Sequence, residues 1–140
     1  MIDRTNVQVL IFAKNPKVKF LILKRTPERS GYWQPVCGGV EQGENLEDTV
    51  KREVFEETGI RNIKSIIDLN YTFKYCEPKN GKQMKMQDYC FAVEIEEVVD
   101  IRISDEHERY VWCTYEEAMN YLKWEHNIIA LKKLVNKLNL

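Results

Sequence analysis

The segment Leu46–Thr58 constrains the fold more than any other part of the chain. Within it, Leu46, Val50 and Val54 recur at a spacing of four, which is the period of one apolar helix face. Gly59 follows directly, and a glycine in that place commonly ends a helix because it adopts a left-handed conformation without steric cost. The sequence therefore predicts a helix over 46–58 whose apolar stripe is anchored to a core.

Three glutamates lie beside that apolar stripe. At roughly 100° per residue, Glu53, Glu56 and Glu57 fall within an arc of about 100° on one helix face. Like charges three and four positions apart destabilise a helix by roughly 0.2–0.5 kcal/mol per pair, and Arg52 is the one cation that can reach Glu56. Two interpretations are open at this point. One is a solvated acidic surface, and the other is a site for Mg²⁺, Mn²⁺ or Ca²⁺, which carboxylate oxygens suit better than they suit zinc.

The residues in front of the helix favour the cation site. Gly38 and Gly39 end a short aromatic segment, and paired glycines permit tight backbone geometry in which a carbonyl oxygen can turn toward a metal. From Gly38 onward the pattern is Gly, five residues, Glu44, seven residues, Arg52-Glu53-Val54, one residue, Glu56-Glu57, one residue and Gly59-Ile60. A plain acidic module would leave that spacing unexplained.

Strand-like runs surround this segment. Val7–Ala13 and Phe20–Leu23 are apolar runs of strand length, and the turn signal between them at Asn15-Pro16 predicts a hairpin. Pro35 argues that the next strand is not central, because proline has no backbone N–H to donate to a ladder. A turn is predicted over residues 77–81. The further predicted strands are Tyr32–Cys37, Ile60–Leu69, Tyr71–Tyr75, Asp88–Ile95 and Tyr110–Cys113.

Two more helices are predicted toward the C-terminal end. Thr114 and Glu117 form a capping box that opens a helix reaching about Tyr121. Strands and helices mixed in this way predict an α/β or α+β layer fold, and 140 residues fit one domain over 1–140. The last helix carries an apolar stripe that we expect to pack on the core, formed by Trp124, Ile128, Leu131, Val135 and Leu138.

The composition excludes several classes of partner. Hydrophobic residues make up 44% and charged residues 31%, and the net charge of −1 favours neither a stable nucleic-acid partner nor a membrane. The N-terminal residues do not form a signal peptide, and no apolar run has the length of a membrane span. Four scattered cysteines show no zinc-ligand spacing, so we expect small buried thiols in a reduced, cytoplasmic protein.

The glycine, glutamate and arginine spacing over residues 38–60 resembles the signature box of the Nudix hydrolases. All seven of the invariant-type letters are present, and both bulky aliphatic positions are filled, by Val54 and Ile60. The resemblance implies a mixed central sheet between helices, that is an α/β/α sandwich, with the box as a loop–helix–loop motif. It also implies hydrolysis of a phosphoanhydride in a nucleoside diphosphate linked to another group, with Mg²⁺ or Mn²⁺ as cofactor and a nucleotide-type small molecule as substrate.

The resemblance also assigns roles to residues of the box. Glu56 and Glu57 would be metal ligands, and Glu53 would be a ligand or would orient the attacking water. The Gly38 carbonyl and Glu44 would complete or support the metal site. Arg52 would hold the glutamates in place by ion pairing. The general base is either Glu53 or a residue of the loop Ser104–Glu108, where Glu106 is the candidate by analogy of position.

Residues outside the box are candidates for substrate binding. Lys24 and Arg25 end a predicted strand where side chains can alternate into a cleft, and Arg25 is the preferred phosphate contact. Trp33 lies next to the glycine pair, where it can either stack on a base or pack in the core, and Gln34 follows it. A homodimer is an assembly that the sequence leaves open.

The run Tyr32-Trp33-Gln34, with Glu106-His107 and Trp112 later in the chain, is similar to the branch of dATP and dihydroneopterin triphosphate pyrophosphohydrolases. The second half of the chain also resembles asymmetric diadenosine tetraphosphate hydrolases. Those usually carry Pro-Lys-Gly-His where this chain has Val36-Cys37-Gly38-Gly39. An ADP-ribose hydrolase is a further alternative. A non-catalytic nucleotide or RNA sensor on the same fold would predict a degraded box, whereas all three glutamates of the box are intact here.

Overall fold

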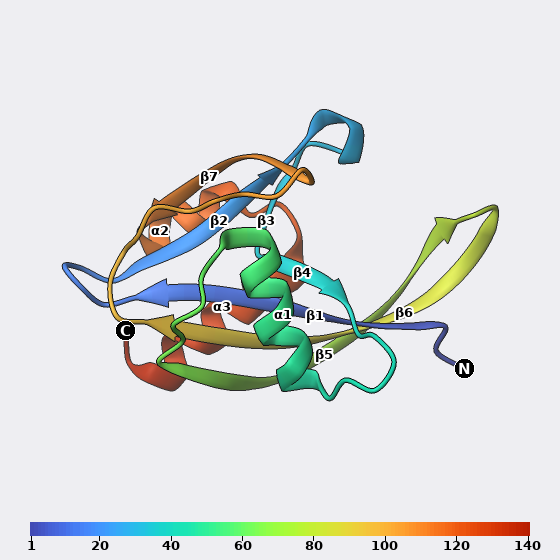
Figure 1. Ribbon diagram of the computed structural model, residues 1–140, viewed down its shortest axis with the longest axis horizontal. Coiled ribbons are helices and arrows are strands. Elements are labelled where there is room, and N and C mark those ends of the chain that lie inside the picture. Colours follow the sequence, from blue (N-terminus) through green and yellow to red (C-terminus); the bar gives the residue numbers. More distant parts are fainter.

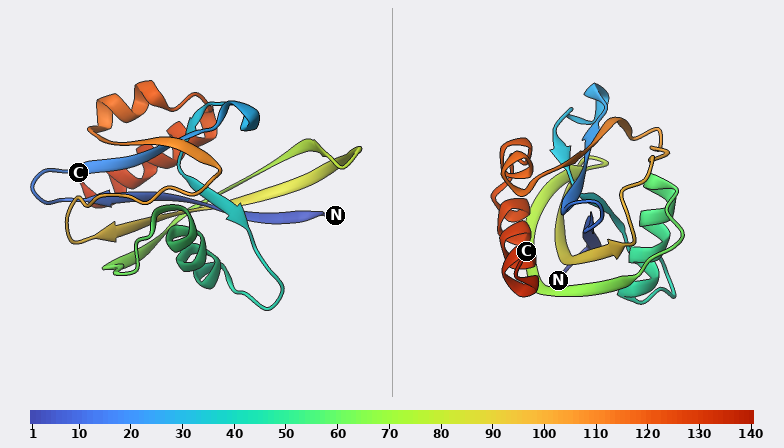
Figure 2. Two further views of the ribbon diagram at one scale, coloured as in Figure 1. Left: turned by 45° about the horizontal axis from the view of Figure 1, so that its top comes forward. Right: turned by 90° about the vertical axis from the view of Figure 1, so that its left-hand side faces the viewer.

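A computed structural model describes residues 1–140 as one mixed seven-stranded sheet with helices on both faces (Figure 1). Helix α1 covers one face, and α2 and α3 cover the other (Figure 2). The α+β fold class predicted from the sequence is confirmed. The elements are β1 Arg4–Ala13, β2 Lys19–Arg25, a 3₁₀ turn at Pro27–Arg29, β3 Trp33–Gln34, β4 Val36–Gly39, α1 Leu46–Thr58, β5 Ser65–Lys79, β6 Lys82–Ile95, β7 His107–Cys113, α2 Tyr115–Tyr121 and α3 Glu125–Leu138.

Strand β1 is the centre of the sheet. It pairs antiparallel with β2 and β4 and parallel with β6, and the remaining strands extend the sheet as β3-β2-β1-β6-β5 with β7 against β2. A strand covered on both faces must be apolar on both, which explains the nearly continuous apolar run from Val7 to Ala13. The pairing of Val7 with Gly38 holds the glycine pair over the middle of β1.

Alternate residues of β1 face opposite sides of the sheet, so they build two separate cores. Val7, Val9 and Ile11 pack with Val50 and Val54, so the predicted apolar stripe anchors α1 to the sheet. Leu10 and Phe12 face α3 instead. They pack there with residues such as Phe20, Ile22, Leu131 and Leu134. The acidic helix is therefore mounted rigidly on a buried strand.

Local signals at both ends fix the bounds of α1, which agree with the sequence prediction. At the N-terminus, Asn45 accepts a hydrogen bond from the backbone N–H of Asp48 (2.8 Å), and the Asp48 carboxylate accepts one from the N–H of Asn45 (3.2 Å). At the C-terminus, Gly59 has a left-handed φ of 78°, and its N–H donates to the carbonyl of Phe55 (2.8 Å). The capping box of Thr114 and Glu117 on α2 is likewise confirmed.

Several predicted strands have different bounds. The segment Tyr32–Cys37 divides at Pro35 into β3 and β4. The runs predicted at Ile60–Leu69 and Tyr71–Tyr75 form the single strand β5, which begins at Ser65 and passes through a bulge near Asn70, a residue with φ of 53°. The turn that follows lies at Asn80-Gly81, so β5 and β6 form a longer hairpin that projects from the body of the protein (Figure 1).

The stripe predicted for the last helix is only partly correct. Trp124 is the N-cap of α3 and is 47% exposed, whereas Asn127, Ala130, Leu131 and Leu134 are the buried residues of that helix. The expectation that every cysteine is buried is wrong for Cys76, which is exposed on β5. All four cysteines are free thiols.

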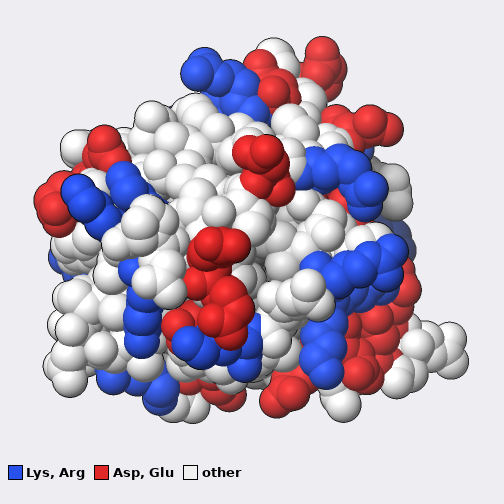
Figure 3. All heavy atoms as spheres, turned by 60° about the vertical axis from the view of Figure 1, so that its left-hand side comes forward, with Lys and Arg blue, Asp and Glu red and all other residues white.

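Acidic and basic side chains lie side by side on the face of the molecule drawn in Figure 3, without a broad surface of one sign. This agrees with the small net charge of −1. None of the helices has both the length and the apolar character that crossing a membrane requires.

Candidate active site

Arg52 is the centre of a hydrogen-bonded cluster that joins α1 to the loop before it. Its guanidinium donates to both carboxylate oxygens of Glu44, at 2.7 and 3.0 Å, and to the carbonyl oxygen of Gly39 at 2.7 Å. It also donates to Glu53 at 2.8 Å and to Glu56 at 3.2 Å. The Arg52 guanidinium lowers the pKa of Glu44 to about 2. One arginine thus ties the strand end, the loop and the acidic helix together.

The carboxylate of Glu53 lies directly against the backbone of Gly38. A Cβ atom at position 38 would be 2.1 Å from the Glu53 carboxyl carbon and 2.3 Å from each oxygen, so no side chain fits there without displacing Glu53. Glu53 is only 8% exposed. The first glycine of the box is therefore required by close approach, and the contact fixes where the Glu53 carboxylate can lie.

Glu57 is the most unusual carboxylate of the chain. It is 1% exposed, and neither of its carboxyl oxygens has a hydrogen-bond partner. Burial, followed by the interaction with the neighbouring Glu53 carboxyl, raises the pKa of Glu57 well above its ordinary value. A buried carboxylate with empty lone pairs needs either a proton or a cation. Glu56, by contrast, points outward with 54% of its side chain exposed.

The donor set around Glu57 fits a hard divalent cation. The available atoms include the carboxylate oxygens of Glu57 and of its neighbour Glu53, and such oxygen donors suit Mg²⁺ and Mn²⁺. No group of three or more His, Cys, Asp or Glu side chains converges closely enough to form a finished metal cage. Three of the carboxylates, those of Glu44, Glu53 and Glu56, are instead held in ion pairs with Arg52.

Arg25 and His107 face Glu57 from the neighbouring strands. The pairing of β2 with β7 sets Arg25 opposite His107, and His107 Nδ1 lies 3.7 Å from Glu57 Oε1. The Nε atom of Arg25 is buried without a partner, while its Nη1 donates to the Tyr32 hydroxyl at 3.4 Å. Burial and the positive charges of Arg25 and Arg29 lower the pKa of His107 to about 4. His107 was not among the predicted site residues, although its position directly after Glu106 and the resemblance carried by Glu106-His107 were available signals.

The other predicted residues occupy varied positions. Glu106 lies at the rim in an ion pair with Arg29 (3.2 Å), and its charge still helps to raise the pKa of Glu57. Lys24 is paired with Glu108 at 3.0 Å. The ring of Trp33 packs 4.6 Å from that of Tyr121, which is core packing on the α3 side.

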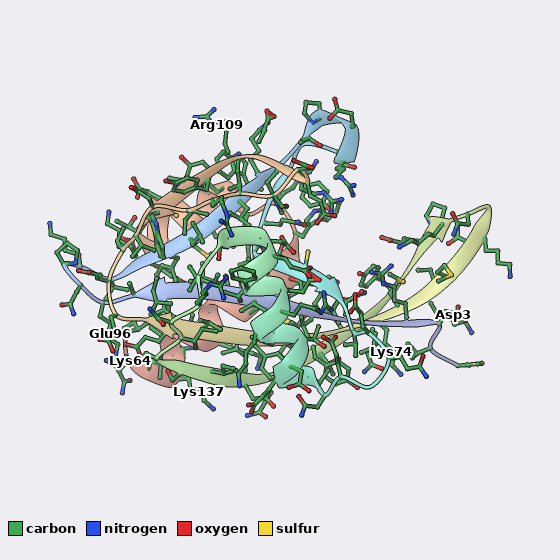
Figure 4. All side chains as sticks on the ribbon, viewed as in Figure 1. Asp3, Lys64, Lys74, Glu96, Arg109 and Lys137 are labelled. Atoms are coloured by element: carbon green, nitrogen blue, oxygen red, sulfur yellow. The ribbon has the colours of Figure 1, made fainter.

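Gln34 is buried, and its amide nitrogen lies 3.4 Å from His107 Nε2. Side chains fill the space between α1 and the sheet, whereas labelled charged residues such as Asp3 and Lys64 lie at the periphery (Figure 4).

The chain belongs to the NUDIX domain family, whose model matches residues 4–134. It is accordingly a Nudix hydrolase, as the spacing of the box indicates. A protein described as a NUDIX hydrolase from Listeria monocytogenes has a similar crystal structure. The TM-score is 0.81 at 29% sequence identity, and the match covers 96% of this chain and 94% of that one.

Curated relatives have several different names. An octanoyltransferase of Myxococcus xanthus is 29% identical over 122 residues, which cover 87% of this chain but 34% of that protein, so the chain spans about a third of its length. An asymmetrical bis(5'-nucleosyl)-tetraphosphatase of Rattus norvegicus is 32% identical over 125 residues, covering 85% of this chain and 80% of the relative. A dihydroneopterin triphosphate diphosphatase of Haemophilus influenzae is 27% identical over 142 residues, which cover 94% of this chain and 87% of the relative.

Proposed function

We propose that the protein hydrolyses a phosphoanhydride bond in a nucleoside triphosphate or a related compound of the dATP or dihydroneopterin triphosphate type. The products would be a monophosphate and pyrophosphate, and the cofactor would be Mg²⁺ or Mn²⁺. One observation carries the proposal: two unpaired carboxylate oxygens of Glu57 and an unpaired Nε–H of Arg25 are buried in the same site. A cation on the first and a phosphate oxygen on the second would satisfy both.

Glu53, Glu57 and the Gly38 carbonyl would hold the cation, with Glu56 and Glu44 released in part from Arg52 to support it. When bound, a divalent cation neutralises polyphosphate charge and lowers the pKa of water at the site. Without that neutralisation a polyphosphate would be repelled by the acidic helix. This is why an acidic helix and an anionic substrate are compatible in the proposal.

The chain's own residues would then position the phosphate and accept a proton from the attacking water. Arg25 would hold a phosphate oxygen through Nε–H, and its contact with the Tyr32 hydroxyl would keep the guanidinium oriented. Glu53, or Glu106 at the rim, would accept the proton of the attacking water. As the new P–O bond forms, the anhydride P–O bond breaks and the pyrophosphate leaves with the electron pair.

A second substrate class is favoured by one comparison. The identity to the asymmetrical bis(5'-nucleosyl)-tetraphosphatase, 32%, exceeds the 27% identity to the dihydroneopterin triphosphate diphosphatase. A dinucleoside tetraphosphate is therefore the alternative substrate. The motif Val36-Cys37-Gly38-Gly39 favours the nucleoside triphosphate type, because it departs from the Pro-Lys-Gly-His of the tetraphosphate-cleaving proteins. The four free cysteines favour a reducing compartment, and we place the protein in the cytoplasm on that ground.

The test is a substrate panel with product analysis. The protein would be incubated with Mg²⁺ and dATP, dihydroneopterin triphosphate, diadenosine tetraphosphate, ADP-ribose or a 5'-triphosphorylated RNA. Release of pyrophosphate from a triphosphate supports the proposal, whereas release of ATP from the dinucleoside compound favours the alternative. Incorporation of ¹⁸O from labelled water identifies the phosphorus atom that is attacked.

A matched pair of variants links the activity to the site. Glu57→Gln should abolish turnover, because the amide cannot supply two anionic oxygens. Glu47→Gln makes the same change on an exposed position of α1 that has no side-chain partner, and it should retain activity. Tight nucleotide binding without turnover of any panel compound would contradict the enzyme proposal and favour a sensor.

A further inference from the structure

We propose that His107 is a positioning residue for Glu57, and that Gln34 holds its imidazole in the tautomer with the proton on Nδ1. The inference rests on the proposed function, since it explains how Glu57 would be oriented as a metal ligand. It gives Gln34 an internal role in place of the substrate contact that the sequence predicted.

The first support is where unsatisfied polar atoms gather. The chain has four buried side-chain nitrogen or oxygen atoms without a hydrogen-bond partner: both carboxyl oxygens of Glu57, His107 Nδ1 and Arg25 Nε. His107 Nδ1 and Glu57 Oε1 are 3.7 Å apart, and their side chains are 1% and 2% exposed. Native proteins rarely leave such atoms unpaired. Two of them facing each other at this distance indicate that His107 and Glu57 belong to one buried contact.

The second support is the chemistry of the Gln34 amide. Its nitrogen lies 3.4 Å from His107 Nε2, and an amide nitrogen can only donate. His107 Nε2 must therefore accept, so the proton of a neutral imidazole is on Nδ1, facing Glu57. If Glu57 is ionised, as a metal ligand must be, the opposite amide orientation would put a bare Nδ1 against its carboxylate, which leaves two buried acceptors facing each other at a cost in stability.

The sheet explains why these residues meet. Strand β2 lies between β3 and β7, and its pairings set Leu23 opposite Gln34 and Arg25 opposite His107. A bulge between Lys24 and Arg25 adjusts the register at the point where His107 begins β7. Both residues are buried, with 7% of Gln34 and 5% of His107 exposed, so neither presents much surface to a substrate. Their order is Gln34 to His107 to Glu57, a chain of donors that ends on the carboxylate.

Such indirect partners orient a ligating carboxylate, and their loss typically costs about 10–100-fold in metal affinity or activity. The expected effect is therefore a lower kcat, with KM changed little, because neither Gln34 nor His107 would touch the nucleotide. If Gln34 or His107 served only the stability of the sheet, its substitution would lower the melting temperature without lowering kcat selectively.

The decisive readout needs no substrate. The chain has two histidines, His107 and His126, so side-chain ¹⁵N NMR spectra are assigned by one variant, His126→Asn. His126 is a suitable control because it stacks on Phe73 and contacts the Tyr71 hydroxyl, away from Glu57. We expect the wild-type protein, saturated with Mg²⁺, to show a neutral His107 with its proton on Nδ1. In Gln34→Glu, whose carboxylate only accepts, the proton should move to Nε2. A wild-type spectrum with the proton on Nε2, or with an imidazolium, would overturn the proposal.

Two substitutions of His107 test the donor itself. His107→Asn keeps an N–H near the position of Nδ1, whereas His107→Leu removes it at similar volume. We expect kcat to fall by about 10–100-fold in the leucine variant and to be rescued at least partly by asparagine. Equal kcat values for the two folded variants would contradict the positioning role. If no panel compound is hydrolysed by the wild type, the proposed function fails, while the NMR result still decides the tautomer.

Discussion

Gly38→Ala tests whether the exact place of the Glu53 carboxylate governs catalysis. The added methyl group would lie 2.1 Å from the Glu53 carboxyl carbon, whereas ordinary contacts begin at 3.4 Å. The carboxylate must therefore retreat by roughly 1 Å, given that difference. Because it is the end of a flexible side chain, it can do so, but only by giving up its 2.8 Å hydrogen bond from Arg52.

The expected magnitudes follow from that displacement. Overpacking of this kind costs about 1–3 kcal/mol, and the flexible neighbour places this case toward the lower end. With an unfolding entropy of about 2.1 cal/mol/K per residue, the melting temperature should fall by roughly 3–10 °C. A misplacement of about 1 Å in a catalytic group costs on the order of 10²-fold in rate. The variant should therefore be folded at room temperature and almost inactive.

The assay combines a thermal melt with steady-state kinetics on the best panel substrate. Gly39→Ala is the matched control, because its methyl group would meet the guanidinium of Arg4 at 2.4 Å instead of Glu53. We expect a similar loss of melting temperature from the control, with at least tenfold less loss of kcat. A Gly38→Ala enzyme with kcat within about threefold of wild type would refute the link between the Glu53 position and turnover.

Four further predictions follow from the same cluster and from α2. Arg52→Lys should lower the free energy of unfolding by about 1.5–3 kcal/mol in urea titrations, since an ammonium cannot replace the fork that binds Glu44; an unchanged midpoint would contradict this. Because the folded-state pKa of Glu44 is lowered from 4.5 to about 2, its contribution to stability is present above pH 4.5 and is lost as pH falls toward 2. Glu44→Gln should make the melting temperature depend less on pH between 4.5 and 2, and a pH profile identical to that of the wild type would count against this role of Glu44. Mg²⁺ at 100 times its Kd should stabilise the protein by about 2.7 kcal/mol, and Glu57→Gln should remove that gain in thermal melts. Thr114→Ala should cost about 1 kcal/mol through loss of the cap on the Glu117 N–H, and a melting temperature equal to wild type would exclude that role.

The features that the sequence predicts well are those encoded by neighbouring residues. The bounds of α1 were predictable because the apolar period and the Gly59 terminus lie within one short segment. The cluster of Arg52 with its glutamates was predictable for the same reason. The prediction of two strands, Ile60–Leu69 and Tyr71–Tyr75, is wrong because Asn70 interrupts the apolar pattern without ending the strand. In the structure it forms a bulge, stabilised by its N–H donating to Asp68 (2.8 Å).

The features that the sequence predicts poorly depend on strand register. Gln34 and His107 are 73 residues apart, and they meet only because both flank β2. Nothing near Trp33 in the sequence indicates that its ring turns to Tyr121 rather than toward the glutamates. The burial of a side chain also depends on residues that are distant in the sequence. For this reason Glu56 and Glu57, which are adjacent and chemically identical, could not be distinguished before the fold was known.

The difference between these two glutamates explains how the proposed site would favour a cation. The folded-state pKa of Glu57 is raised above its ordinary value of 4.5, so its effect on the pH dependence of stability is opposite to that of Glu44. The unfolded chain loses this proton near pH 4.5 while the folded, metal-free protein keeps it, so stability falls as pH rises above 4.5 toward the folded-state pKa. A divalent cation at the proposed site would have to displace that proton, so its binding should strengthen with pH over the same range. Burial of Glu57 thus makes the empty site costly at neutral pH. A bound cation would remove that cost, which is why the stabilisation by Mg²⁺ should be larger at pH 8 than at pH 6.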